Sequence, residues 1–332
     1  MNKLAKIICA MCIAVSSVTL FTACGNNDAA DNNATHTHRW STWTRTDTEH
    51  SRQCRDGNCN EIQRAAHEGG ICKACADFNI VAFGDLNGSD PAHNDFVKEA
   101  NTWFPANLKS HGFYYEFNGN WNAMTDEYLN DYDLVMFLNN MPGSATAQTA
   151  FRKYMENGGA WLGCHVSAFS MNNDKSDWQK WYHNEFLGSG DFRTNTWNPT
   201  RNKLKTETHG HFATADLPDT FLSAYNEWYN WEYDLRKNDD ITILLSIDPS
   251  GYPVGDKPGE TWNYDYENPD APNNFCPVAW TNNNYNMIYM NMGHNLQDYN
   301  TYEKHSETFA SATQNKFILN AIFGLVGYDP II

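Results

Sequence analysis

The chain has 332 residues, of which 40 are acidic and 23 are lysine or arginine, and its formal net charge is −17. So acidic a protein repels the phosphates of nucleic acids and anionic lipids, which argues against nucleic acid or an anionic membrane surface as a partner. The length suffices for one large domain with a complete hydrophobic core and a small additional unit.

The N-terminal segment has the features of an export signal. In "MNKLAKIICAMCIAVSSVTLFTAC", Lys3 and Lys6 precede an apolar run, and small residues precede Cys24. The run is too short and too lightly flanked for a good transmembrane helix, so residues 1–23 are predicted to be a secretory signal peptide. Its removal takes away two lysines and no acid, which changes the formal charge from −17 to −19.

The end of this segment, Phe21-Thr22-Ala23-Cys24, resembles a lipobox, in which the cysteine is lipidated and becomes the first residue of the mature protein. Phe21 departs from the usual leucine, and plain secretion is the alternative. Residues 24–35 are polar and acidic, which is typical of a flexible tether. We expect an exported protein, anchored through a lipid on Cys24 to the periplasmic or cell-surface side of a membrane.

A small cysteine-rich and histidine-rich module is predicted at residues 36–76. Its cysteines have the spacing Cys54-x4-Cys59-x12-Cys72-x2-Cys75. Two closely spaced pairs resemble a zinc ribbon, because each pair can form one edge of a tetrahedron around structural zinc. Two disulfides, which an exported location permits, and free thiols are the alternatives. Four histidines are possible replacement ligands: His36, His38, His50 and His67.

Strand-like and helix-like segments alternate in the main domain, residues 77–332. The strand-like runs are "FNIVAFGD", "FYYEFNG", "DLVMFLNN" and "GGAWLGCH", and amphipathic segments lie between them. This alternation predicts an α/β fold with a doubly wound, mostly parallel sheet and right-handed crossovers. Ligands of such sheets bind beyond the carboxyl ends of the strands, which makes Asp85 and Asn139 candidate substrate-binding residues.

The second half of the main domain is less regular. "WQKWYHNEFLGSGDF" is predicted to be a helix, "ITILLSI" a strand, and residues 249–274, rich in proline, glycine and asparagine, a long loop. "CPVAWTNNNYNMIYMNMGH" is predicted to be a hairpin with its turn at the three asparagines, and "QNKFILNAIFGLVG" to be the closing helix.

Three patterns in this domain, in this order, resemble the ThuA-like family, which is named for trehalose utilisation. They are "GGAWLGCH", "HFATADLPDTF" followed by "NEWYNW", and "CPVAWT" followed by "MIYMNMGH". The resemblance covers roughly residues 78–330 and implies a flavodoxin-like, class I glutamine amidotransferase-like fold and a role in sugar catabolism. Phe212 stands where the family usually has proline, and Asn226 where it usually has aspartate.

The resemblance also bears on the chemistry. Amidotransferases of this fold have a nucleophilic cysteine at the strand-to-helix elbow within Gly-x-Cys-x-Gly, whereas the register here is Gly163-x-His165. His165 is therefore expected at the tip, and Cys164, one residue earlier, on the opposite side. The late His-x-Glu of the amidotransferases is also absent, since Asn295 and Leu296 follow His294. We expect no glutaminase activity.

The same patterns bring four candidate catalytic residues to one edge of the sheet: His165, His211, Glu227 and His294. Trp228 and Tyr229 are candidate substrate-binding residues, with His209 and Trp231 nearby. Histidines beside one carboxylate can bind a divalent metal or act as general acid and base, and both interpretations stay open.

The leading hypothesis is an exported, lipid-anchored protein that processes a carbohydrate or an oxidised keto-sugar, as a hydrolase or an isomerase-type enzyme. A non-catalytic glycan-binding lipoprotein, in which aromatic stacking dominates, is the alternative, and a scaffold recruited through the cysteine-rich module is a third. No glycine fingerprint of a dinucleotide-binding fold is found, so a nicotinamide dehydrogenase is unsupported.

If Cys24 carries the lipid, Cys24→Ser should release the protein from the membrane fraction, because stable attachment needs the acyl chains that this cysteine would bear. Immunoblots of membrane and soluble fractions measure this. Cys12→Ser, in the predicted signal peptide, is the matched control and should stay with the membrane. An unchanged membrane fraction in the Cys24 variant would contradict the anchor.

Overall fold

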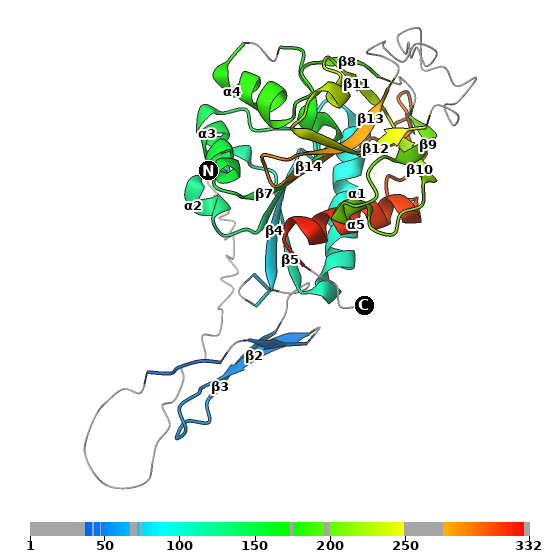
Figure 1. The fold of residues 1–332 in the computed structure, drawn as a ribbon. Coiled ribbons are helices and arrows are strands. Elements are labelled where there is room, and N and C mark those ends of the chain that lie inside the picture. The colour runs from blue at the N-terminus through cyan, green and yellow to red at the C-terminus, as the bar shows by residue number, and fades with distance from the viewer. Residues whose placement is uncertain are drawn as a thin grey trace, which may run out of the picture. The chain divides into compact units, whose positions relative to one another are not determined.

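The structure is a computed structural model that describes residues 37–41, 43–46, 48–66, 72–73, 75–172, 175–195, 199–248 and 275–328 (Figure 1). The predicted signal peptide, tether and long loop, with Cys24, His36 and His67, lie outside the described residues. The chain divides into two compact units, Met1–Ala66 and His67–Ile332.

The first unit contains a three-stranded antiparallel sheet. Its strands are β1 (Thr44–Arg45), β2 (Glu49–Gln53) and β3 (Ile62–Ala66), in the order β1-β2-β3. The division between the units falls inside the predicted module, so that Cys54 and Cys59 belong to the first unit and Cys72 and Cys75 to the second.

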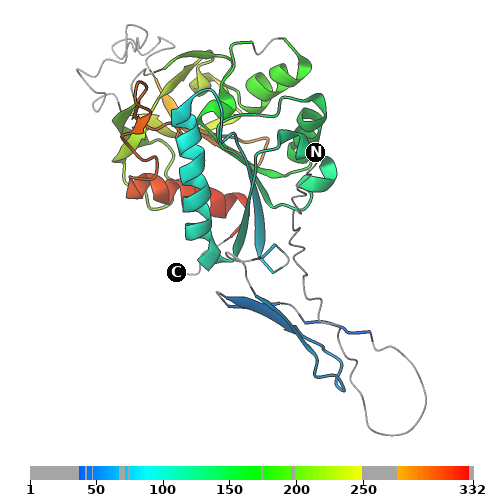
Figure 2. The same ribbon diagram turned by 180° about the vertical axis from the view of Figure 1, so that it is seen from behind.

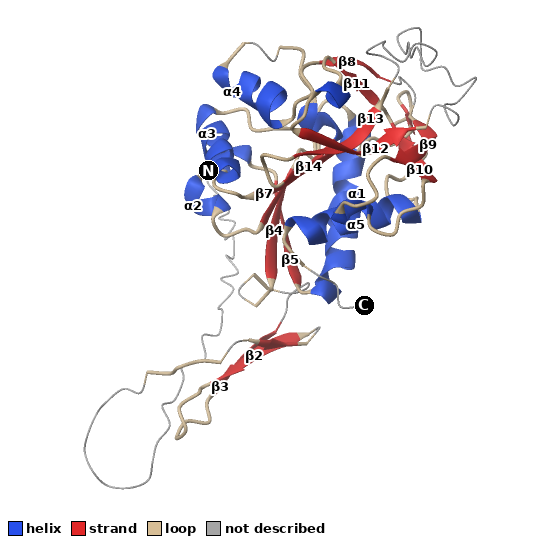
Figure 3. Ribbon diagram, viewed as in Figure 1, coloured by secondary structure: helices blue, strands red, loops and turns tan. Residues whose placement is uncertain are grey.

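The second unit is built on a nine-stranded sheet in the order β10-β9-β12-β13-β14-β7-β6-β4-β5 (Figure 3). Its strands are β4 (Phe78–Phe83), β5 (Phe113–Asn118), β6 (Leu134–Phe137), β7 (Ala160–Cys164), β9 (Thr200–Thr206), β10 (Thr220–Asn226), β12 (Ile241–Ile247), β13 (Pro277–Asn282) and β14 (Met287–Met290).

One half of this sheet is parallel and the other is antiparallel. Strands β14, β7, β6, β4 and β5 pair in parallel, while β13, β12, β9 and β10 continue the sheet with antiparallel pairs. The chain starts at β4 and moves first to β5 and then, on the other side, to β6 and β7. This flavodoxin-like order confirms the predicted doubly wound fold, and it places the carboxyl ends of β4, β6, β7 and β14 along one edge.

Helices cover both faces of the sheet. On one face α1 (Pro91–Leu108) and α5 (Ala312–Leu325) pack with one cluster of buried side chains, as Figure 2 shows from behind. On the other face lie α2 (Asp126–Leu129), α3 (Ala145–Glu156), α4 (Asp177–Gln179) and the π-helix Lys180–Phe186, around a second buried cluster rich in aromatic rings. Burial on both sides explains why β6 and β7 are continuously apolar.

Local sequence signals set the helix ends. The Asp90 side chain caps α1 by accepting from the Ala92 N–H at 2.8 Å, and Pro91 supplies the first helical residue. Ser144 caps α3 in the same way, and Gly158 follows that helix with a left-handed φ of 86°.

Two small sheets and one hairpin complete the unit. Strand β8 (Phe192–Asn195) pairs with β11 (Tyr229–Trp231), and β15 (Gln297–Asp298) pairs with β16 (Glu303–Lys304). The predicted hairpin is present as the antiparallel pair β13–β14. Among the helices that the structure describes, none has the length and apolarity needed to cross a membrane.

His183 gives the fold a measurable pH dependence. It is completely buried in the π-helix, and burial lowers its pKa from 6.5 to about 4. The unfolded chain therefore binds a proton on this histidine more tightly than the folded protein does. Protonation of the unfolded chain leaves the free energy of unfolding unaffected above pH 6.5 and lowers it as the pH falls from 6.5 toward 4. A shift of this size corresponds to about 3 kcal/mol.

We therefore expect the free energy of unfolding of the wild type to fall more steeply between pH 6.5 and pH 4 than that of His183→Phe. Urea titrations at several pH values measure both slopes. His305→Ala, at a partly exposed histidine, should follow the wild type. Parallel curves for the wild type and His183→Phe would contradict the buried neutral ring.

Candidate functional site

His165 occupies the tip of the elbow after β7. It starts a short 3-10 turn, and its φ of 42° is a left-handed value that few residues other than glycine adopt. Its side chain is completely buried. Backbone strain at a buried polar residue on a strand end is typical of functional sites, because the surrounding structure must hold it in place.

Two glycines make room for the packing around the elbow, Gly163 against Trp161 and Gly293 against His165. A Cβ atom on Gly163 would lie 1.9 Å from the Trp161 ring, and one on Gly293 would lie 3.0 Å from the Cβ atom of His165. Gly293 has a φ of 144° and turns the chain after β14 so that His294 enters the same region. The glycines of the two motifs are thus required by the packing around the histidines.

The Asn291 carboxamide fixes which ring nitrogen of His165 carries the proton. Its Oδ1 accepts from the Tyr229 N–H at 2.7 Å, which leaves its Nδ2 to donate to His165 Nδ1 at 2.9 Å and to the Tyr289 hydroxyl at 3.2 Å. Because Nδ1 accepts, the proton of the neutral ring lies on Nε2. That atom lies 3.4 Å from Glu227 Oε2.

Glu227 lies between β10 and β11, at the other side of the same cluster. Its Oε1 accepts from the Asn195 side-chain amide of β8, and its Oε2 lies 4.0 Å from His294 Nε2. Its neighbour Tyr229 stacks on His165 with ring centroids 4.1 Å apart. Glu227 therefore comes from the antiparallel half of the sheet and meets histidines from the parallel half.

The structure adds residues that the sequence analysis missed. The cap residue Asp90 has Oδ2 3.8 Å from His294 Nε2 and 4.0 Å from His93 Nδ1. His93 lies in the first turn of α1, with its ring 5.1 Å from that of His165. The Tyr299 hydroxyl donates to Asp90 at 3.2 Å, and with 48% of its surface exposed Tyr299 borders the site on the solvent side.

We call the five central residues the histidine–carboxylate cluster: Asp90, His93, His165, Glu227 and His294. Three buried nitrogens of this cluster, His93 Nε2, His165 Nε2 and His294 Nδ1, have no hydrogen-bond partner among the described residues. A buried polar atom without a partner costs about 1–3 kcal/mol, so three in one place are expensive to keep for structure alone. This concentration indicates a site for a ligand or for chemistry.

Burial shifts the pKa values of His165 and Glu227 toward each other. Burial lowers the pKa of His165 well below its usual range, and the nearby His294 acts in the same direction. Burial also raises the pKa of Glu227, against the opposing charges of His294 and His93. Burial thus favours the neutral ring at His165 and the protonated form of Glu227, so that Glu227 can donate a proton and take it back while His165 Nε2–H donates a hydrogen bond, an arrangement that suits general acid–base catalysis.

Two overlapping sets of atoms are spaced closely enough for a metal ion. His93, His165 and Glu227 form one set, and Asp90, His93 and His294 the other, with ligand atoms within 4.8 Å of one another. A histidine ligand normally donates its second N–H to an acceptor, but His165 Nδ1 faces the amide donor of Asn291. The first set therefore fits a metal poorly, and the second is the better candidate for a divalent cation.

Asp85 and Asn139, predicted to bind substrate, are engaged in a structural network. The Asp85 N–H donates to Asn139 Oδ1 at 2.7 Å, and Asn139 Nδ2 donates to the Asp85 carbonyl at 2.8 Å. The Asp85 carboxylate accepts from Trp121 Nε1 at 2.9 Å and from Asn140 Nδ2 at 2.6 Å. These bonds join the ends of β4 and β6.

His211 and Trp228 are placed apart from the cluster. His211 caps a short 3-10 turn, where its Nδ1 accepts from the Ala213 N–H at 3.2 Å. The segment with His209 and His211 is therefore not a strand, and the two rings do not share a strand face. Trp228 is completely buried in the core beside α1 and α5, and its indole donates to Thr200. Of the predicted aromatic residues, the structure brings Tyr229 to the cluster.

Cys164 is a core residue in this structure. Its side chain has no exposed surface and packs in the cluster beneath α1 and α5. Burial raises the pKa of its thiol well above the usual range, so the nucleophilic thiolate is strongly disfavoured.

Comparisons with known proteins agree with this architecture. The ThuA family model, described as trehalose utilisation, matches residues 86–314. The chain belongs to the ThuA family. A putative ThuA-like protein from Bacteroides uniformis is 31% identical, with a TM-score of 0.65 over 76% of this chain and 93% of that one. No curated protein matches the chain.

More distant structures are similar at lower levels. A putative ThuA-like protein from Parabacteroides merdae is 15% identical, with a TM-score of 0.49 over 75% of this chain and 90% of that one. The glutaminase domain of Trypanosoma brucei CTPS is 7% identical, with a TM-score of 0.42 over 76% of this chain and 96% of that one. The assignment to the ThuA family rests on the family model and on the Bacteroides uniformis structure.

The two departures from the usual ThuA pattern have local explanations. Asn226 is fully buried, accepts from the Gly293 N–H at 3.1 Å and donates to the Ala224 carbonyl at 3.3 Å, a donation that an aspartate could not make. The Phe212 ring occupies the space where a Cβ atom on Gly324 of α5 would be 1.9 Å away. Phe212 and Gly324 are thus complementary.

A buried thiol with a raised pKa should not act as a glutaminase nucleophile. We expect Cys164→Ser to leave turnover of any substrate within about threefold of the wild type, and a glutamine-analogue electrophile to leave Cys164 unmodified. Intact-protein mass spectrometry measures the labelling. A stoichiometric adduct on Cys164 would overturn the elbow register.

Proposed function

We propose that this ThuA-family protein is exported and lipid-anchored, and that it processes a carbohydrate or an oxidised keto-sugar by proton transfer at the histidine–carboxylate cluster, without glutaminase activity. The observation that carries the proposal is the pairing of His165, a neutral ring whose Nε2–H can donate a hydrogen bond to a substrate oxygen, with Glu227, a carboxyl group whose pKa is raised by burial and which can therefore donate and accept a proton.

The chemistry of sugars makes this pairing useful. Opening a glycosidic bond requires protonation of the leaving oxygen, and isomerising a keto-sugar requires removal of a proton beside a carbonyl and its return elsewhere. Each reaction needs one group that donates and one that accepts. The Glu227 carboxyl group can fill both roles in turn, and His165 Nε2–H, 3.4 Å away, can donate a hydrogen bond to the sugar oxygen on which charge develops.

Asp90 has a different task in this proposal. Although burial works against its ionisation, hydrogen bonding to His294 and the charge of His93 keep the pKa of Asp90 well below its usual range. The ionised carboxylate would orient His294 and stabilise positive charge that develops on the histidines. If a divalent cation binds here, Asp90, His93 and His294 would hold it, and it would polarise a sugar oxygen.

The carbohydrate part of the proposal is supported by the family description, trehalose utilisation, and by the half-exposed Tyr299 beside the cluster. The glycan-binding alternative relied on an exposed aromatic surface. Trp228 is buried and Trp231 is only 5% exposed, so neither presents a ring on which a sugar could stack. Their burial therefore favours the enzyme over the glycan-binding protein.

The proposal is tested by conservative variants of the cluster. We expect His165→Asn, Glu227→Gln and His294→Gln each to lower turnover by roughly 10²-fold or more, the usual scale for lost acid–base help. Asparagine tolerates the left-handed φ at position 165, and glutamine can still accept from Asn195, so the fold should survive. A double variant should lose less than the sum of both.

The measurement is a product assay with trehalose, other disaccharides and their keto derivatives, together with calorimetric binding. His305→Ala, a partly exposed histidine, is the matched control and should behave like the wild type. Retention of wild-type turnover in the three cluster variants would refute the proposed site. Sugar binding that is weakened in them, with no turnover by the wild type, would refute catalysis at the cluster and leave it as a binding pocket.

A further inference from the structure

The first compact unit has little core of its own. Strand β3 has four exposed residues and one intermediate one, and β2 buries only His50. Its aromatic contacts are polar in character: the Arg52 guanidinium lies 5.0 Å from the Trp40 ring and 4.5 Å from the Trp43 ring. Units this small are normally held together by disulfides or a metal ion.

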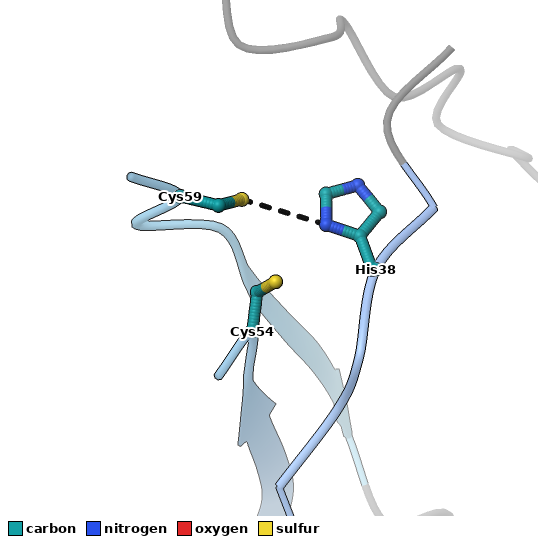
Figure 4. A group of neighbouring side chains, drawn as sticks. All are labelled: His38, Cys54 and Cys59. Carbon is teal, nitrogen blue, oxygen red and sulfur yellow. Dashed lines mark hydrogen bonds between the residues drawn. The ribbon is translucent and has the colours of Figure 1, made fainter. Parts of the chain in front are cut away.

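The loop between β2 and β3 brings two cysteines and one histidine together. Cys54 and Cys59 are each only 5% exposed, and their sulfur atoms and a nitrogen of His38 all lie within 4.8 Å of one another (Figure 4). Figure 4 shows the three side chains pointing toward a common centre, with Cys59 Sγ 3.5 Å from His38 Nδ1.

Backbone contacts contribute to this arrangement. Trp40 forms a bridge with Cys54, and the Arg55 N–H donates to the Arg39 carbonyl at 2.7 Å, which holds the segment with His38 against the loop. The Cys59 N–H donates to the Asp56 carbonyl at 2.8 Å and turns the second cysteine back toward the first. The main chain therefore helps to preorganise the three ligands.

We propose that His38, Cys54 and Cys59 bind a zinc ion and thereby tie the segment before β1 to the β2–β3 loop. Zinc–sulfur bonds of about 2.3 Å and zinc–nitrogen bonds of about 2.0 Å give a tetrahedral edge of about 3.6 Å, close to the Cys59–His38 separation of 3.5 Å. One imidazole and two sulfurs are donors typical of zinc.

The charges balance in this site. Each thiol loses its proton on binding, so that two protons are released, and two thiolates with one neutral imidazole neutralise the Zn²⁺ ion. The Asp56 carboxylate, 3.7 Å from Cys54 Sγ and paired with Arg39 at 2.6 Å, adds negative potential next to the cation. Three protein ligands leave a fourth position of the tetrahedron.

This assignment differs from the four-cysteine ribbon expected from the spacing. A ligand set within the first unit needs neither Cys72 nor Cys75, which belong to the second. It also differs from a Cys54–Cys59 disulfide, which would make no use of the His38 imidazole beside Cys59.

The test uses the full chain with Cys72→Ser and Cys75→Ser, prepared under reducing conditions, stripped with EDTA and reloaded with Zn²⁺. The background also carries His294→Gln, which removes a ligand of the second candidate metal set, so that mass-spectrometric metal analysis should find about one zinc ion per chain. Adding His38→Ala or Cys59→Ser should weaken zinc binding at least tenfold, because one of three ligands is lost. His305→Ala in the same background is the matched control and should change nothing.

His38→Cys distinguishes a lost ligand from a damaged fold, since a thiolate at this position can still bind the ion. We expect it to retain zinc, while His38→Ala does not. Co²⁺ loaded in place of Zn²⁺ should show thiolate charge-transfer absorption that disappears in Cys54→Ser. The proposal is overturned if the Cys72/Cys75 background binds no zinc, if His38→Ala binds it like the background, or if the oxidised wild type shows a Cys54–Cys59 disulfide.

Discussion

The Asn291 carboxamide connects the parts of the chain on which the site depends. It follows β14, receives the backbone N–H of Tyr229 at the start of β11, and donates to His165 after β7. One amide thus joins two strand ends of the parallel half of the main sheet to the small β8–β11 sheet. Because all its polar atoms are buried and bonded, it can take only one orientation, and that orientation decides where His165 carries its proton.

This constraint bears on the proposal that the histidines are functional groups rather than packing residues. Several unfavourable features lie close together here: a strained backbone at His165, a glycine with positive φ at Gly293, and ring nitrogens without hydrogen-bond partners among the described residues. Apolar side chains of similar size would avoid these costs. At the neighbouring position of the strand, Cys164 is packed among apolar side chains and has none of them. The two adjacent residues therefore differ: His165 points into the histidine–carboxylate cluster, and Cys164 packs in the apolar core.

The fold was largely predictable from the sequence, because alternation of buried strands and amphipathic helices has few topological solutions. The register argument also placed His165 at the elbow, since strand residues alternate in direction. Asp90 and His93 were missed because "SDPAH" has a complete local explanation as a helix cap, although the first turn after a parallel strand faces the ligand edge. Trp228 and Tyr229 could not be distinguished, because the sequence does not tell which side of a short irregular segment is buried.

The position of β14 has a consequence for how the chain folds. Residues 287–290 form a central strand, between β13 and β7, although they are near the end of the chain, and Met287 pairs with Trp161. During synthesis β7 must wait with an unpaired, apolar edge until more than a hundred later residues have been made. Such long-range pairing is slow, and an open strand edge invites association with other chains. The central β7–β14 pair therefore forms late, and the newly made protein is most prone to aggregation just before β14 pairs with β7.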